Sequence, residues 1–340
     1  MRHALITGIT GQDGSYLTEH LLAQGYEVWG LSHRNANPQT RDLLRQVRMI
    51  RGDLLDKKSL VSAIEQAEPD EVYNLADISY VPHSWEHAEL AGRVAGLGAL
   101  QVLEAIRLGS GITESRSPGP GQIRFYQASS AEIFGRTPES PQNEESLLHP
   151  CSPHGAAKAY AHYTTQSYRE LYGMFAVSGI LFNHESPRRA AEFVSRKVSL
   201  GVARVKLGYE QKLRLGDLSN RRDWGYAGDY VRAMHLMLAQ DEPEDFVVGT
   251  GVTHSVEDLV SRSFAVAGLN WRNHVVHDTA FFRPAEPEYL CADPAKAKQC
   301  LGWTSTVSFD ELLSMMVESD LKLLSNRDAE VYQISEPGAW

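Results

Sequence analysis

The sequence predicts an α/β fold in which a doubly wound parallel sheet precedes a smaller C-terminal α/β lobe. Short apolar runs alternate with helical patterns over the first half of the chain, and this alternation typically builds a parallel sheet with helices on both faces. A glycine-rich turn follows the first apolar run. Beyond about residue 183 the alternation weakens and Arg, Trp and Pro motifs stand between short elements, so we place the second lobe there.

The first two elements set the pattern. Residues 3–8 form an apolar run that predicts a buried strand, and residues 14–25 predict a helix with leucines on one face and Gly25 at its end. The later elements of this half are expected as strands at 27–33, 49–56, 71–76, 124–130 and 175–182 and as helices at 57–67, 89–109 and 154–172.

One segment between these elements is rich in Gly, Ser and Pro. It covers residues 110–121 and predicts a surface loop. We expect the sheet domain to span residues 1–182 and the second lobe to span mainly residues 183–340. Parts of 220–255 are expected to return to the sheet domain.

The composition excludes several classes of protein. A net charge of −10 disfavours a nucleic-acid partner, and an anionic ligand needs Lys and Arg gathered locally. The three cysteines form no CxxC pair, so we expect neither a disulfide framework nor a metal site. The N-terminus leads directly into a strand and no apolar run has the length of a membrane span. We therefore expect a soluble, cytoplasmic protein without a membrane partner.

The glycine-rich turn has the spacing of a dinucleotide-binding loop of the Rossmann type. Its glycines allow a sharp turn, close approach of the backbone to a pyrophosphate, and tight packing of helix on strand. The pyrophosphate is expected at the N-terminus of the following helix, where free N–H groups favour an anion. The loop residues are Gly8, Thr10, Gly11, Gln12, Asp13 and Gly14.

The second strand indicates which dinucleotide is bound. It ends in Ser32, His33 and Arg34, without the Asp or Glu that holds the ribose hydroxyl in NAD sites. Arg34 can pair with a 2′-phosphate, so we expect NADP rather than NAD, the alternative being that Arg34 is a solvated surface residue. Asp53, after the third strand, is placed to accept from the adenine amino group or, alternatively, to cap its own turn.

Eight segments resemble the GDP-mannose 4,6-dehydratase family, which belongs to the wider class of nucleotide-sugar epimerases and dehydratases. The resemblance runs from residue 3 to about residue 320. The segments are TGITGQDGSYL (7–17), PDEVYNLA (69–76), FYQASSAEIFG (125–135), SPHGAAKAYAH (152–162), YGMFAVSGILFNHESPRR (172–189), RRDWGYAGDYV (221–231), PEDFVVGTGV (243–252) and FFRPAEPEYLCADPAKAKQCLGW (281–303).

The resemblance implies an NADP-dependent enzyme. In this family the sugar is oxidised at C4, loses water across C5 and C6, and is reduced at C6 to give GDP-4-keto-6-deoxymannose. The resemblance implies GDP-mannose as the substrate and a homodimer formed by the helices near 89–109 and 154–172. It also places beside the cofactor Leu54, Leu75, Ala76, Lys158, His184 and Arg189.

The base of the reaction is where the sequence departs most from its relatives. The superfamily uses a Tyr-x-x-x-Lys pair on one helix face, in which the tyrosine takes the hydroxyl proton as the hydride leaves. Here the lysine is Lys158, but the tyrosine position holds His154. Three alternatives remain open: His154 acts as the base directly or through a water, another residue such as Tyr80 or Ser130 takes the proton, or redox activity is lost or slowed.

The elimination motif is partly retained. By resemblance Ser130 hydrogen-bonds the sugar hydroxyl, and Glu132 abstracts the C5 proton and helps to expel water at C6. The intervening hydroxyl residue is replaced by Ala131, so a structural role for Glu132 stays open. Asp77 stands where the family has a small residue; the sequence offers no account of this change.

The remaining matched positions imply substrate contacts. Arg222 and Arg283 are expected to bind the diphosphate, since planar guanidinium groups suit phosphate oxygens. Asn183 and Lys197 match sugar-nucleotide contacts, and Glu286 matches an acceptor for guanine or ribose. Two alternatives to the dehydratase remain: an epimerase or a dehydratase of another GDP-sugar that uses His154, and a catalytically impaired homologue that binds a GDP-sugar.

Overall fold

The protein is described by a computed structural model that covers residues 1–32, 40–112, 121–278 and 289–325. Within these residues a seven-stranded sheet has the order β10-β6-β5-β4-β1-β2-β3, and every neighbouring pair is parallel. This confirms the predicted doubly wound sheet. The strands are β1 (His3–Thr7), β2 (Glu27–Ser32), β3 (Arg48–Arg51), β4 (Glu71–Asn74), β5 (Arg124–Ala128), β6 (Ala176–Leu181) and β10 (Phe246–Val248).

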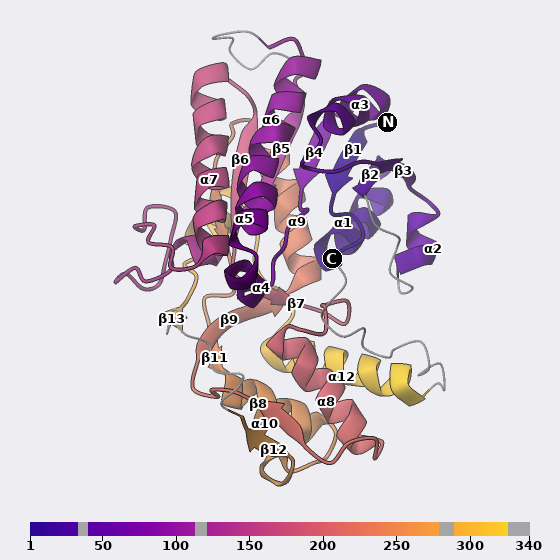
Figure 1. Ribbon diagram of the computed structural model, residues 1–340, viewed down its shortest axis with the longest axis vertical. Helices are drawn as coiled ribbons and strands as arrows, with labels where there is room; N and C mark the ends of the chain where they lie inside the picture. Colours follow the sequence, from indigo (N-terminus) through magenta and orange to yellow (C-terminus); the bar gives the residue numbers. More distant parts are fainter. Residues whose placement is uncertain (33–39, 113–120, 279–288, 326–340) are drawn as a thin grey trace.

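Helices cover both faces of this sheet (Figure 1). Along β1, Ala4 and Ile6 pack into one hydrophobic core, and Leu5 packs into another on the opposite face. The first core includes α1 (Gln12–Ala23), α9 (Ala227–Leu238) and α11 (Ala295–Leu301). On the second face lie α3 (Lys57–Ala67), α6 (Gly98–Gly109) and α7 (Pro153–Tyr172).

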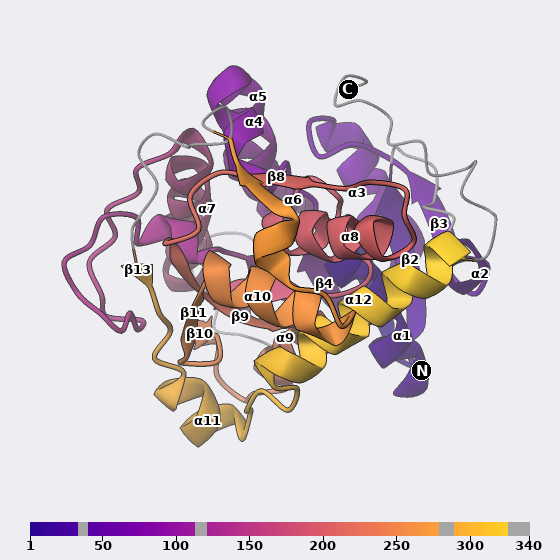
Figure 2. The same ribbon diagram turned by 90° about the horizontal axis from the view of Figure 1, so that it is seen from below.

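The second lobe packs three helices on small sheets. Its helices are α8 (Val194–Lys206), α10 (Val256–Val266) and α12 (Phe309–Ser325), which share one hydrophobic core (Figure 2). A four-stranded sheet joins β7 (Asn183–Glu185), β9 (Arg221–Tyr226), β11 (Thr253–Ser255) and β13 (Tyr289–Leu290). A two-stranded sheet pairs β8 (Leu213–Leu215) with β12 (Val275–His277), and a 3-10 turn spans Trp271–Asn273.

The chain crosses between the two parts more than once. After β9, helix α9 packs on the large sheet and β10 pairs with β6 at its edge. The segment then returns to the second lobe through β11 and α10. Within the described ranges, we find no helix that is both long and apolar enough to cross a membrane.

The helical stretch expected over about 89–109 is confirmed in its extent, but it is not α-helical throughout. The chain there runs through α5 (Ala88–Ala91), a π-helical turn (Gly92–Leu97) and α6. The π turn lies against α7, and an inserted residue of this kind locally widens a helix where it packs. Two short helices, α2 (Arg41–Leu44) and α4 (Val81–Glu86), were also not predicted, because four to six residues carry too little periodicity.

Candidate functional site

A cleft of about 1690 Å³ lies at the carboxyl ends of the parallel strands and extends to the second lobe. This is the edge at which open α/β sheets bind ligands. Residues of the glycine loop, of the first turn of α7 and of α8 all line it. The predicted cofactor, catalytic and substrate positions that fall in the described residues are thus brought to one cavity.

The glycine loop fits a dinucleotide phosphate. Gly8 has a φ of 70°, and a Cβ added there would lie 2.7 Å from the backbone nitrogen of Ala76. A Cβ at Gly14 would lie 2.5 Å from the carbonyl oxygen of Gly8. In the described structure no side chain caps α1 at Gly11, and the residues of its first turn line the cleft. The helix therefore presents backbone N–H groups that suit an anion.

A charged pair fixes this loop to the strand that follows β6. The Nε2 atom of His184 lies 2.8 Å from Asp13 Oδ2, and its Nδ1 lies 2.8 Å from the carbonyl oxygen of Phe182. Burial opposes the charges, but His184 lowers the pKa of Asp13 to about 2, and Asp13 raises the pKa of His184. Both ring nitrogens face acceptors, so His184 is an imidazolium. Gln12 adds a hydrogen bond to the carbonyl oxygen of His184 at 3.0 Å.

The other predicted cofactor residues also lie along the cleft. Asp53 lines the cleft, and its Oδ1 accepts a hydrogen bond from the backbone N–H of Leu55 at 2.9 Å. This bond is the turn cap that the sequence offered as the alternative to adenine binding. Arg189 pairs with Glu185 at 3.1 Å. Arg34 lies outside the described residues. The cleft is also lined by Thr10, Leu54, Leu75 and Ala76.

Two of the predicted catalytic residues, His154 and Lys158, form a buried charged group with Asp77. The Nε2 atom of His154 and the Nζ atom of Lys158 each lie 2.9 Å from Oδ2 of Asp77. Lys158 also donates to the carbonyl oxygen of Ala128, at the end of β5, at 2.9 Å. A carboxylate therefore lies against both side chains of the expected base–lysine pair.

Asp77 is ionised in this position. Burial acts to raise the pKa of its carboxyl, but the charges and hydrogen bonds of Lys158 and His154 hold that pKa well below its usual range. Its second oxygen, Oδ1, accepts the backbone N–H of Ile78 at 2.7 Å. The residue that the sequence left unexplained is therefore the anion of the site.

The elimination motif lies next to the start of α7. Ser130 caps a 3-10 turn (Ala131–Ile133), and its Oγ accepts the backbone N–H of Glu132 at 3.2 Å. Gly155 packs so tightly on this turn that an added Cβ would lie 2.6 Å from the carbonyl oxygen of Glu132. This contact brings Ser130, Glu132 and His154 to the same wall of the cleft.

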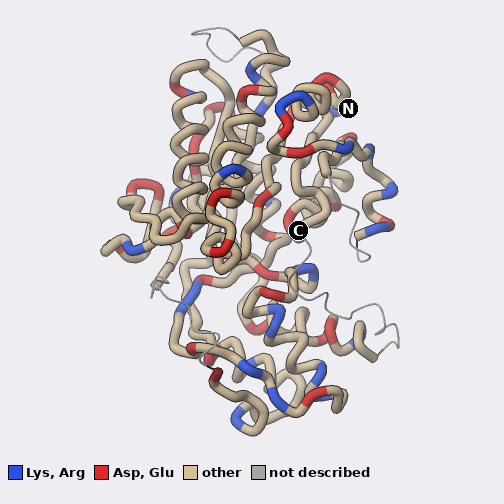
Figure 3. The backbone as a smooth tube through the Cα atoms, viewed as in Figure 1, with Lys and Arg blue, Asp and Glu red and all other residues tan. Residues whose placement is uncertain are grey.

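Lys and Arg residues occur along several segments of the second lobe (Figure 3), and some of them line the cleft. Lys197, Arg222 and Asn183, which are predicted to contact the substrate, line the cleft. Arg283 and Glu286 lie outside the described residues. The cleft is also lined by Arg204, Lys212 and Arg214. The sequence interpretation missed these three; for Lys212 and Arg214 the alternation of charged and apolar residues over 212–215 was the available signal.

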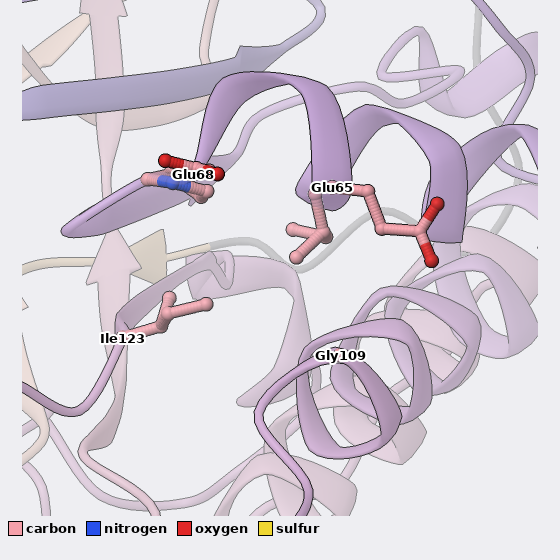
Figure 4. Close-up of a pocket in the computed structure, with 6 residues that line it drawn as sticks. Glu65, Glu68, Gly109 and Ile123 are labelled. Atoms are coloured by element: carbon pink, nitrogen blue, oxygen red, sulfur yellow. The ribbon is translucent and has the colours of Figure 1, made fainter.

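A second, smaller pocket of about 400 Å³ lies beside α3 and α6 (Figure 4) and shares no lining residue with the cleft. Its lining residues are Ile64, Glu65, Glu68, Pro69, Gly109 and Ile123. These side chains include no cation, and their charged groups are the two carboxylates of Glu65 and Glu68. The large cleft is therefore the candidate site.

Known proteins match almost the whole chain. The family model for GDP-mannose 4,6 dehydratase matches residues 5–316. The chain is 47% identical to GDP-mannose 4,6 dehydratase 1 of Arabidopsis thaliana, over 94% of this chain and 90% of that protein. It is 44% identical to GDP-mannose 4,6 dehydratase of Homo sapiens, over 94% and 92% of the two chains. Among solved structures, the UDP-glucose 4-epimerase of Thermus thermophilus in complex with NAD is similar, with a TM-score of 0.81 and 29% identity over 94% of this chain and 99% of that one. The chain belongs to the GDP-mannose 4,6-dehydratase family.

Proposed function

We propose that the protein is a lyase that converts GDP-mannose to GDP-4-keto-6-deoxymannose with a recycled NADP cofactor. One observation carries the proposal. A single cleft unites the glycine loop at Gly8 with Ser130, Glu132, His154 and Lys158. A nicotinamide held in this cleft supplies hydride transfer, which the family uses to remove a hydride from C4 and return it at C6.

The chain's own residues handle the protons. Ser130 holds the C4 hydroxyl, and His154 takes its proton, directly or through one water, because imidazole is a base at neutral pH. Glu132 removes the proton at C5, which the neighbouring ketone acidifies, and protonates the departing hydroxyl at C6. When the hydride is returned at C6, C5 takes up one proton from water, which balances the proton lost from the C4 hydroxyl. Lys158 supplies a positive charge to the cleft, and its contacts with Asp77 and the carbonyl oxygen of Ala128 hold that charge in place.

The second lobe holds the nucleotide diphosphate. Arg222 is buried beside the cleft and suits a bidentate contact with phosphate oxygens. Lys197 adds a point charge from α8, and Asn183 offers hydrogen bonds to the sugar from β7. Arg283 and Glu286 keep their sequence-based roles in binding the diphosphate and the guanine or ribose.

The preference for NADP rests on the end of β2. That strand ends at Ser32, which lines the cleft and carries no charge to repel a 2′-phosphate. Arg34 follows closely and supplies the positive charge. Calorimetric titration should give at least tenfold tighter binding of NADP⁺ than of NAD⁺, in line with about 1.4 kcal/mol for one charge-assisted contact. Equal affinities for NADP⁺ and NAD⁺ would mean that Arg34 is a solvated surface residue that does not contact the cofactor.

We propose a homodimer that pairs α6 and α7 with the same helices of a second copy. Large apolar side chains are exposed on this part of the molecule, whereas monomers rarely expose extended apolar patches. They are Leu97, Leu108, Tyr160, Tyr163 and Leu171. Analytical ultracentrifugation should give twice the mass of one chain, and Tyr163→Glu should shift the protein towards the monomer.

Product analysis tests the proposed function directly. The purified protein is incubated with GDP-mannose and catalytic NADP⁺, and the sugar nucleotide is followed by mass spectrometry and NMR. We expect the loss of one water and a new keto signal without accumulation of NADPH. A product of unchanged mass with altered stereochemistry would identify an epimerase, and an intact substrate that still binds would identify a non-catalytic homologue.

A further inference from the structure

We propose that Asp77 is a positioning residue that fixes the tautomer of His154, so that Nδ1 is the atom that accepts the substrate proton. The inference rests on the proposed function, because it concerns the base of that reaction. It joins two of the cleft positions at which this chain departs from its family, Asp77 and His154. Neither the sequence nor the family resemblance explained Asp77.

The first support is how rigidly Asp77 is held. Its Oδ1 accepts the N–H of Ile78 at 2.7 Å, and its Oδ2 lies 2.9 Å from both His154 Nε2 and Lys158 Nζ. The side chains of Asp77, His154 and Lys158 are only 5%, 4% and 7% exposed. A carboxylate with contacts on both oxygens in a buried setting has one orientation.

A ladder of hydrogen bonds stabilises the strand ends around it. The hydroxyl of Thr7 donates to Asn74 at 2.7 Å, and Asn74 donates to Gln127 at 2.8 Å. Gln127 donates to the carbonyl oxygen of Ala128 at 2.9 Å. That carbonyl also accepts from Lys158 at 2.9 Å. The ends of β1, β4 and β5 are thereby tied to the charged group that contains Asp77.

The tautomer follows from the ionisation of Asp77. An ionised carboxylate can only accept hydrogen bonds, so the Nε2 atom of His154 must carry the hydrogen between them. The lone pair of a neutral imidazole is then on Nδ1. That atom is buried and has no hydrogen-bond partner in the described part of the chain. Nδ1 is therefore the one ring atom able to receive a proton.

The charges also explain why the two changes belong together. In a Tyr–Lys site, the phenolate that forms is the anion beside the lysine. Here Asp77 is a permanent anion beside Lys158 and takes the place of that phenolate. With a neutral His154, the group of three residues has the same total charge as a phenolate–lysine pair. Protonated His154 is then stabilised by Asp77, as in other sites where a carboxylate supports an imidazole.

The oxidation removes one proton and one hydride from the sugar. The C4 hydroxyl loses its proton to Nδ1 of His154 and its carbon loses a hydride to the nicotinamide, which leaves a C4 ketone. His154 later releases that proton to water. The charged and titratable groups that line the cleft on the elements around the start of α7 include Asp77, Lys158, Glu132 and Cys151, and from α4 and the residue before it Tyr80, His83 and Glu86.

The first test removes the charge of Asp77 but keeps its shape. Asp77→Asn should lower kcat by a factor of about 10² to 10⁴, the range for losing a correctly oriented base, with KM changed less than about threefold. The acidic limb of the pH–rate profile should move to lower pH, because an amide does not stabilise an imidazolium. Asp42→Asn removes a carboxylate that is 89% exposed on α2 and does not line the cleft, and it is the matched control, expected to leave kcat unchanged.

The second test is a double substitution. His154→Tyr alone should remain poorly active, because the Asp77 carboxylate disfavours a neighbouring phenolate. His154→Tyr with Asp77→Ala restores the family's arrangement and should be at least about tenfold more active than either single variant. Independent, additive effects of the two substitutions would overturn the coupling.

A third measurement separates this inference from the proposed function. Nitrogen-15 NMR of labelled histidine, with the His154 signals assigned by His154→Gln, should report an Nε2–H tautomer in the unmodified protein and its loss in Asp77→Asn. An Nδ1–H tautomer in the unmodified protein would overturn the inference even if GDP-mannose is dehydrated. If the tautomer is as expected but no water is lost from GDP-mannose, the proposed function fails and the positioning role of Asp77 stands.

Discussion

His154 Nε2 lies 2.9 Å from Asp77 Oδ2, although 77 residues separate them in the chain. Asp77 follows β4, and His154 stands in the first turn of α7. The dipole of a helix disfavours a positive charge at the N-terminus. An imidazole at this position can therefore accept a proton only if a nearby anion stabilises the imidazolium. Asp77 is that anion.

Glu132→Gln should separate oxidation from elimination. The amide keeps the shape of the side chain but cannot take the C5 proton. We expect water loss to slow by a factor of about 10² or more, whereas NADPH and the C4-oxidised sugar accumulate in a single turnover. Nicotinamide absorbance and product mass report the two steps. If water is lost at the normal rate, Glu132 has only a structural role.

Gly8→Ala should disrupt the cofactor loop. Gly8 has a φ of 70°, and its new methyl group would lie within 2.7 Å of Ala76. We expect NADP⁺ binding to weaken at least tenfold, about 1.4 kcal/mol. Gly25→Ala is the matched control, because Gly25 has a φ of 81° but nothing within 4 Å. It should cost about 1–2 kcal/mol of stability from backbone strain and leave affinity unchanged.

The Asp13–His184 pair should stabilise the folded protein only within a limited range of pH. The pKa of Asp13 falls from 3.8 to about 2, so its contribution is present above pH 3.8 and is lost as the pH falls towards 2. The pKa of His184 is raised above 6.5, so its contribution is present below pH 6.5 and is lost as the pH rises through the folded-state value.

Urea unfolding of the unmodified protein and of His184→Gln checks this window. The difference in free energy of unfolding should be largest between about pH 4 and 6.5, and about 2 kcal/mol there, since one pKa unit corresponds to about 1.4 kcal/mol. A difference that does not vary between pH 3 and 9 would show that the pair is not charged.

Asp320→Ala should loosen the second lobe. Asp320 on α12 is fully buried, forms an ion pair with Arg196 on α8 and accepts from Ser199 at 2.7 Å. Its loss leaves a buried guanidinium without its anion, which costs about 3–5 kcal/mol. Asp310→Ala breaks the exposed pair with Arg262 and should cost less than about 1 kcal/mol in the same thermal unfolding experiment. Equal losses would contradict this assignment.

Local patterns predicted most of the sheet domain. The helix expected at 57–67 coincides with α3, and the one expected at 154–172 differs from α7 by one residue. Both have apolar periodicity and an end signal, which are local properties. The π turn at Gly92–Leu97 could not be predicted in this way, because it depends on packing against α7.

The sequence by itself determined the parallel sheet, the nucleotide loop at Gly8, the family and the presence of a histidine at position 154. Only the tertiary structure decided the charge of the site, because the end of β4 brings Asp77 against His154 and Lys158. Electrostatic energy depends on distance and burial in space. When two residues belong to different elements, their spacing along the chain specifies neither the distance between them nor their burial.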